Sequence, residues 1–259
     1  HRLLGKITET ADPEKLGYDL GIIAGDIVYA LAIDAFLSIR ESPQRKEQAL
    51  KYFIQTAAFT AMGEFIAIVH SVKDISQVTE KDVFLNYTLK TARYTFECPL
   101  GVGAILAGAG KKDIQKLSRL GILMGQAFQI QDDILGVFDS EKNIGKSILS
   151  DIAESKKTIL ICHAYHQLPF QKRKIFLQYF SKPRKSFRDL LAIREILKEA
   201  GSLQYSLQAI QSRLIKSQKV LHSLTMHDFY RRLIQRSLHE LFSPTTEMAQ
   251  NNRVDVVGN

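Results

Sequence analysis

Apolar residues recur at helical spacing along most of the chain. Residues three or four positions apart lie on one face of an α-helix, so each such series predicts a helix with a buried side. Four series stand out in the first half: Ile22, Ile23, Ile27, Leu31 and Ala35; Leu50, Phe53, Ile54, Ala57, Ala61, Phe65 and Ile68; Phe84, Tyr87, Thr91 and Tyr94; and Ile114, Leu117, Leu120, Gly121, Met124, Phe128 and Leu135. The apolar–polar alternation that is typical of strands is nearly absent. The pattern therefore predicts an all-α protein.

Polar segments that contain proline, glycine or serine separate the predicted helices. The breaks fall at residues 41–43, 71–79, 108–112, 140–155 and 182–186. Further helices are expected over residues 190–197, 207–224 and 229–241. Residues 243–259 are polar and aperiodic, which favours a disordered tail. We expect one helical domain over residues 1–242, a bundle with an apolar interior, followed by that tail.

The composition is that of a globular protein, with 45% hydrophobic and 24% charged residues. The net charge of +8 indicates either a solvated basic surface or affinity for polyanions such as phosphorylated substrates. No block of Lys and Arg is interleaved with aromatic residues, which argues against nucleic acid as a partner. Cys98 and Cys162 belong to no C-x-x-C pair, so we expect two buried thiols in a reducing compartment.

The longest apolar stretch, residues 20–37, contains Asp26 and Asp34. A membrane helix is expected to have about 20 apolar residues without such charges. We therefore expect a buried helix of a soluble protein and no transmembrane segment. No basic-then-apolar leader is visible either, so a cytoplasmic location is expected.

Two adjacent carboxylates, Asp132 and Asp133, lie in the middle of an otherwise apolar predicted helix. On a helix surface such a pair would be an ordinary solvated charge pair, but two like charges in an apolar setting cost energy unless a cation lies between them. Mg²⁺ commonly bridges one or two carboxylates to a substrate phosphate. Lys146, Lys156 and Lys157 follow in the next polar segment, and lysines bring positive charge to phosphate oxygens. Together these residues predict a site for Mg²⁺ and a diphosphate substrate.

The run of residues 128–138, followed by Gly145-Lys146, Ser150-Asp151 and Lys156-Lys157-Thr158, resembles the second aspartate-rich region of the trans-polyprenyl diphosphate synthases. A second segment, residues 89–92, is similar to the lysine-threonine helix of that family. The form of the first run resembles the short-chain farnesyl and geranylgeranyl diphosphate synthases. The resemblance implies an all-α, isoprenoid synthase-type helical bundle around a central cavity.

The resemblance also implies roles for individual residues. Asp132 would hold Mg²⁺, with Asp133 second, and Gln129 would orient the site by hydrogen bonding. Lys90, Asp132 and Lys146 would be catalytic. The residues that would contact the substrate diphosphate are Lys90, Thr91, Gln129, Lys146 and Lys156.

The sequence departs from the family pattern at several positions. Neither the first D-D-x-x-D motif nor the R-R-G segment occurs in the 259 residues, and His1 resembles the histidine that follows them in the family. We therefore expect the domain to be incomplete at its N-terminus, with the isopentenyl diphosphate-binding residues upstream. Gly136 replaces the third aspartate, and Glu64 follows Gly63 where many members have glutamine.

The implied activity is Mg²⁺-dependent prenyl transfer, in which isopentenyl diphosphate is added to an allylic diphosphate. We expect a C15 to C20 product, with C20 favoured, a homodimer, and a loop over residues 139–155 that is mobile without ligand. One alternative is a non-catalytic partner subunit or an inactive fragment, which the missing first motif favours. Another is a class I terpene cyclase or squalene-type synthase, which the Gly145-Lys146 and Lys156-Lys157-Thr158 segments disfavour.

Overall fold

The computed structural model describes residues 12–138 and 150–254, and these ranges contain helices and no strand. The helices are α1 (Pro13–Leu37), α2 (Pro43–Val72), the 3₁₀ turn η2 (Ile75–Gln77), α3 (Glu80–Tyr87), the π-helix η3 (Thr88–Glu97), α4 (Cys98–Leu106), α5 (Lys111–Phe138), α7 (Ser150–Ala153), α8 (Ile159–Gln167), α9 (Phe170–Phe180), α10 (Phe187–Glu199), α11 (Ser202–His222) and α12 (Asp228–Val254). The predicted all-α class is confirmed. Periodicity alone did not predict α8 and α9.

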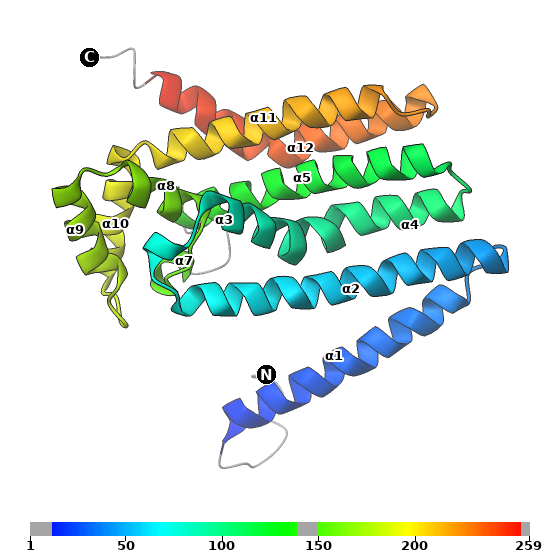
Figure 1. Ribbon diagram of the computed structural model, residues 1–259, viewed down its shortest axis with the longest axis horizontal. Helices are drawn as coiled ribbons and strands as arrows, with labels where there is room; N and C mark the ends of the chain where they lie inside the picture. Colours follow the sequence, from blue (N-terminus) through cyan, green and yellow to red (C-terminus); the bar gives the residue numbers. More distant parts are fainter. Residues whose placement is uncertain (1–11, 139–149, 255–259) are drawn as a thin grey trace.

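Helix α5 lies at the centre of the bundle. Figure 1 shows α2, α4, α5, α11 and α12 running along the long axis of the molecule, with α8, α9 and α10 at one end. Leu120, Ile130 and Ile134 of α5 are fully buried, and they belong to a core that extends through α8, α10 and α11. The site described below lies where α5 approaches η3 and the start of α8.

The π-helix η3 packs backbone against backbone between α2 and α5. A Cβ atom on Gly63 of α2 would lie 2.6 Å from the backbone nitrogen of Lys90. On α5, a Cβ on Gly121 would lie 2.5 Å from the Cα of Glu97, and one on Gly125 would lie 2.5 Å from the Cβ of Ala92. These distances leave no room for a side chain, so the three glycines allow both helices to approach η3 closely.

The apolar face predicted for the first helix is exposed, which corrects the expectation of a buried helix. Ile22 is 68% exposed and Leu31 is 60% exposed. Helix α1 packs along α2 through the stacking of Tyr29 and Phe36 on Phe53, and Figure 1 shows it diverging from the bundle. No other described element covers its apolar face.

Both α1 and α2 are long and apolar enough to cross a membrane by length and composition. The qualifying ranges are Glu14–Leu37, with none of its apolar window buried, and Pro43–Val72, with 11% buried. Core helices of soluble proteins meet the same criterion, so the finding by itself does not assign a membrane span.

The predicted tail over residues 243–259 is wrong at its start, because α12 continues through Pro244 to Val254. Thr245 is buried, and its hydroxyl donates to the side-chain oxygen of Gln131 on α5 (2.8 Å). The Gln131 amide in turn donates to the carbonyl of Leu241 (2.8 Å). These two bonds hold α12 on the core. Thr245 lies in the polar stretch after residue 242, which shows no apolar residues at helical spacing.

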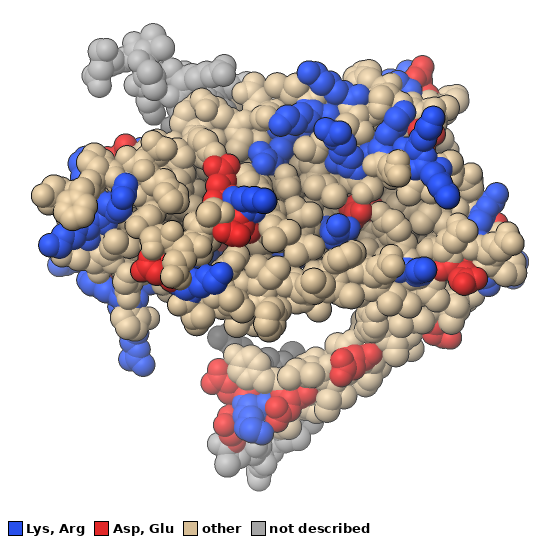
Figure 2. Space-filling model, viewed as in Figure 1, with Lys and Arg blue, Asp and Glu red and all other residues tan. Residues whose placement is uncertain are grey.

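The two cysteines are buried, as predicted, and neither forms a disulfide. Burial raises the pKa of Cys162 to about 12, so this thiol stays protonated at neutral pH. Figure 2 shows Lys and Arg side chains gathered over the end of the molecule where α11 meets α12. Acidic and basic side chains lie close together on the same face near α3.

Replacing Gly125 by alanine is expected to destabilise the fold by roughly 1–3 kcal/mol, because the added methyl group must displace the backbone of η3. Gly103 in α4 is the matched control, since a Cβ there meets nothing within 4 Å. Gly103→Ala should stabilise the protein by about 0.5–1 kcal/mol through its higher helix propensity. Urea unfolding of both variants measures these changes, and equal effects would contradict the close contact.

Candidate active site

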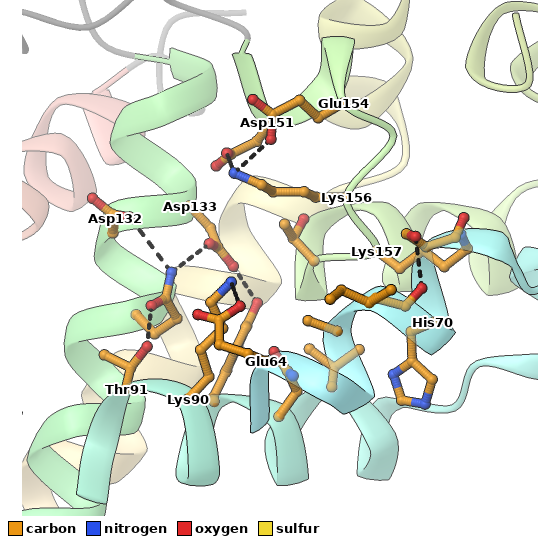
Figure 3. Close-up of a pocket in the computed structure, with 18 of the residues that line it drawn as sticks. Glu64, His70, Lys90, Thr91, Asp132, Asp133, Asp151, Glu154, Lys156 and Lys157 are labelled. Atoms are coloured by element: carbon orange, nitrogen blue, oxygen red, sulfur yellow. Dashed lines mark hydrogen bonds and ion pairs between the residues drawn. The ribbon is translucent and has the colours of Figure 1, made fainter. Parts of the chain in front are cut away.

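A cavity of 750 Å³ lies between α2, the α3–η3 segment, α5 and the segment that precedes α8. Figure 3 shows side chains from all four regions turned toward it. Its charged and titratable lining residues are Glu64, His70, Tyr87, Lys90, Tyr94, Asp132, Asp133, Asp151, Glu154, Lys156 and Lys157. Segments far apart in the sequence therefore place carboxylates and lysines on one cavity.

Asp132 and Asp133 are neighbours in the chain but lie in different environments. Asp132 is exposed, whereas Asp133 is only 3% exposed and both of its oxygens accept hydrogen bonds. The Tyr87 hydroxyl donates to one oxygen, and the Gln129 amide donates to the other at 3.0 Å. Burial raises the pKa of Asp133 to about 7, although these two bonds oppose the shift. Asp132 is thus the carboxylate that is available to a ligand.

Gln129 is held between η3 and the two aspartates. The hydroxyl of Thr91 donates to the side-chain oxygen of Gln129 at 2.6 Å. The Gln129 amide then reaches Asp133, and it lies 3.5 Å from the carboxylate of Asp132. In this arrangement the Thr91 hydroxyl orients Gln129, and Gln129 orients the aspartates.

Lys90 reaches the same cavity, and its ammonium group forms an ion pair with Glu64 (3.1 Å). The pair follows from the backbone contact at Gly63, which brings the next residue of α2 against η3. Both side chains are partly exposed, at 37% for Lys90 and 53% for Glu64, so the pair itself adds little stability. The lysine that the sequence predicts to contact a diphosphate, Lys90, is therefore paired with the carboxylate of Glu64.

The segment before α8 brings in a second lysine with its own carboxylates. Lys156 contacts Asp151 at 2.6 Å and Glu154 at 3.1 Å. Burial opposes a positive charge on Lys156, but the bonds to these carboxylates raise its pKa overall. A Cβ atom on Gly136 would lie 3.2 Å from the carboxylate of Asp151. Gly136 stands where the family motif has a third aspartate. The carboxylate of Asp151, from another segment, therefore lies next to the position of the missing side chain.

Sequence reasoning did not assign several of these residues to the site. Asp151 belongs to the Ser150-Asp151 pair of the motif, but the sequence gives it no role, and Glu64 stands out only because many family members have glutamine at its position. Tyr87 fitted an apolar face and gave no other signal. The predicted mobile loop covers residues 139–155. Its residues 139–149, which include Lys146, lie outside the described residues, as does His1, whereas residues 150–153 form α7.

The cavity offers carboxylate oxygens, which are ligands that Mg²⁺ accepts. Among the described residues no group of three or more His, Cys, Asp or Glu side chains could hold a metal ion by itself. Mg²⁺ is usually held by one or two carboxylates together with substrate phosphates and water, so a complete protein cage is not required. The exposed carboxylate of Asp132, close to two lysines on the same cavity, fits this mode of binding.

The sequence profile described as polyprenyl synthetase matches residues 9–197. The chain belongs to the polyprenyl synthetase family. The family assignment made from the motifs is thus confirmed.

Relatives with similar sequences are named as prenyl diphosphate synthases. The chain is 34% identical to the geranylgeranyl diphosphate synthase of Sulfolobus acidocaldarius over 194 residues, which cover 74% of this chain and 58% of the relative. It is 30% identical to the geranylfarnesyl diphosphate synthase of Aeropyrum pernix over 191 residues, covering 73% of this chain and 58% of that protein. The chain thus spans less than two thirds of the length of the curated relatives it matches.

Solved structures share the fold. The geranylgeranyl pyrophosphate synthase of Corynebacterium glutamicum, complexed with isoprenyl diphosphate and magnesium, superposes with a TM-score of 0.79 at 25% identity. The superposition covers 92% of this chain and 66% of that one. A second geranylgeranyl pyrophosphate synthase gives a TM-score of 0.81 at 24% identity, covering 91% of this chain and 72% of that chain. The predicted isoprenoid synthase-type bundle is confirmed.

Replacing Glu64 by glutamine is expected to strengthen the binding of inorganic pyrophosphate with MgCl₂ by about two- to fivefold, because it frees Lys90 and removes a negative charge from the cavity. Calorimetric titration measures the affinity. Glu47→Gln, on an exposed part of α2, is the control and should leave it unchanged. Weaker binding in Glu64→Gln would contradict this account and would indicate that Glu64 is itself a metal ligand.

Proposed function

We propose that this protein is a prenyltransferase that adds isopentenyl diphosphate to an allylic diphosphate. The observation that supports this most is the convergence of Asp132, Lys90 and Lys156 on one cavity in a chain of the polyprenyl synthetase family. The Corynebacterium structure, which holds isoprenyl diphosphate and magnesium, supports the same substrate class.

In this reaction the bond between the allylic carbon and the diphosphate oxygen breaks, and its electron pair leaves with the diphosphate. The double bond of isopentenyl diphosphate supplies the pair for the new carbon–carbon bond. The resulting cation loses a proton, which gives the longer allylic diphosphate. Because negative charge builds on the departing diphosphate, the barrier falls where fixed positive groups face its oxygens.

We assign that task to Lys90 and Lys156, with Lys146 as a third lysine from the sequence. When bound, Mg²⁺ supplies further positive charge at the diphosphate, and Asp132 would hold it. Asp133, Gln129 and Thr91 would orient Asp132, and Asp151 would add a carboxylate opposite Gly136. Water must be kept away from the carbocation, and apolar residues such as Phe128 and Val83 on the cavity wall serve this purpose.

We propose a short product of C15 to C20, with C20 favoured. The motif form at residues 132–136 and the names of the relatives, several of which are geranylgeranyl diphosphate synthases, support this length. The bulky side chains of Phe128 and Tyr94 line the cavity, and bulky side chains limit the length of a growing chain.

We further propose a homodimer in the cytoplasm, in which a second copy covers the exposed faces of α1 and α2. Ile22 and Leu31 of α1 and Phe65 and Ile68 of α2 are all at least 60% exposed, and large exposed apolar side chains in such number are typical of an interface. Asp26 lies in the middle of α1, which disfavours insertion into lipid.

Asp132→Asn is expected to lower the rate of prenyl transfer by about a hundredfold or more, because it removes the carboxylate proposed to hold Mg²⁺. The assay incubates the full-length protein with radiolabelled isopentenyl diphosphate, an allylic primer and MgCl₂, and resolves products by length. Asp113→Asn, at the far end of α5, is the control and should retain wild-type activity.

Three results of that assay would count against the proposal. Products of C30 or longer would contradict the short-chain assignment. Equal activity of Asp132→Asn and the wild type would contradict the metal assignment. No product from the wild type would instead favour a non-catalytic partner subunit, and the coding sequence upstream of His1 would show whether the first aspartate-rich motif exists.

If the protein is a dimer, its sedimentation coefficient at micromolar concentration should correspond to two copies of the chain. Ile27→Lys places a charge on the exposed apolar face of α1 and should shift the equilibrium toward monomer. Lys51→Glu, a charge change on an exposed position of α2, serves as the control. A full-length wild-type protein that sediments as a monomer would rule out the dimer.

A further inference from the structure

The hydroxyl of Tyr87 joins two parts of the site that lie far apart in the sequence. The side chain ends α3 and is only 5% exposed. Its hydroxyl donates to the carboxylate of Asp133 on α5 and accepts a hydrogen bond from the backbone N–H of Ile159 at 2.9 Å. One oxygen atom thus connects the helix that carries the aspartates to the first residue of α8.

Each end of this connection lies beside groups that face the cavity. Asp133 adjoins Asp132 in the chain, and Ile159 comes three residues after Lys156. The connection between α7 and α8 is short and tightly turned, since Ser155 has a positive φ of 55° and the Lys156 N–H bonds to the Asp151 carbonyl at 2.9 Å. A shift of Ile159 would therefore move Lys156 relative to the aspartates.

Packing alone does not require a hydroxyl at this position. The ring of Tyr87 meets Phe84 edge to face, which a phenylalanine would also do. The hydroxyl satisfies the Ile159 N–H, one of the amides at the start of a helix that have no partner within the helix. It also satisfies a buried carboxylate oxygen, and both groups would be costly to leave without a partner.

We propose that Tyr87 is a positioning residue, which fixes the distance between the aspartates of α5 and the lysine segment before α8. Lys156 and a Mg²⁺ held by Asp132 could then act on the same diphosphate. The inference rests on the proposed function, since it names a further residue that the same site needs. Tyr87 would not touch the reacting atoms. It would act through Asp133 on one side and through the backbone of Ile159 on the other.

The test measures the binding of inorganic pyrophosphate with MgCl₂ to the full chain by calorimetry. Tyr87→Phe keeps the ring and removes only the hydroxyl. We expect its affinity to fall about tenfold. Tyr52→Phe is the matched control, because it also removes a hydroxyl that donates to a buried carboxylate, that of Glu97 (2.7 Å), but away from the cavity. Its affinity should stay within about twofold of the wild type.

A double-mutant cycle separates positioning from general loosening of the fold. If Tyr87 holds Lys156 in place, Lys156→Gln should weaken binding less in the Tyr87→Phe background than in the wild type. Additive effects of the two substitutions, or equal losses in Tyr87→Phe and Tyr52→Phe, would overturn the proposal.

Amide exchange gives a readout that needs neither activity nor ligand. The Ile159 amide should exchange as slowly as core amides of α5 in the wild type, and faster in Tyr87→Phe. Fast exchange at Ile159 in the wild type would overturn the junction even where the variant does not fold. A wild-type chain that binds no pyrophosphate would contradict the proposed function itself, whereas wild-type binding with an unchanged Tyr87→Phe affinity would contradict only the positioning role.

Discussion

The close backbone approach of η3 to two neighbouring helices determines the arrangement of the site. Gly63 on one side and Gly125 on the other leave no space for side chains, so η3 lies directly between α2 and α5. Lys90 then meets the cavity beside α2, and Thr91 reaches Gln129 on α5. A larger residue at either glycine would separate these groups, which are useful only when they lie on one cavity.

A second constraint is the difference in solvation between two adjacent carboxylates. Asp133 is buried and accepts hydrogen bonds from Tyr87 and Gln129, whereas Asp132 is exposed on the cavity. The hydrogen bonds of Asp133 fix the orientation of this part of α5, and Asp132 remains available to bind a ligand. Lys90 is paired with Glu64 and Lys156 with Asp151, so a diphosphate must displace or share these partners.

Periodicity and motif spacing predicted the helical class, the central helix and some of the residues that meet at the cavity, such as Lys90, Asp132 and Lys156. They did not predict that α1 would present its apolar face outward, because spacing reports that a face is apolar and not what covers it. Thr245 shows the opposite failure, since a polar residue is buried where its hydroxyl reaches Gln131 of α5 and the carbonyl of Phe242. The roles of Glu64 and Tyr87 depend on contacts between distant segments, which no local pattern contains.

The most direct test of the central claim is a crystal structure of the full-length protein grown with MgCl₂ and inorganic pyrophosphate. The account predicts pyrophosphate in the cavity between α5 and η3, with Lys90 and Lys156 turned from their carboxylates to its oxygens. It also predicts Mg²⁺ at about 2.0–2.1 Å from the carboxylate of Asp132. Pyrophosphate bound elsewhere, with the Lys90–Glu64 and Lys156–Asp151 pairs intact, would contradict it.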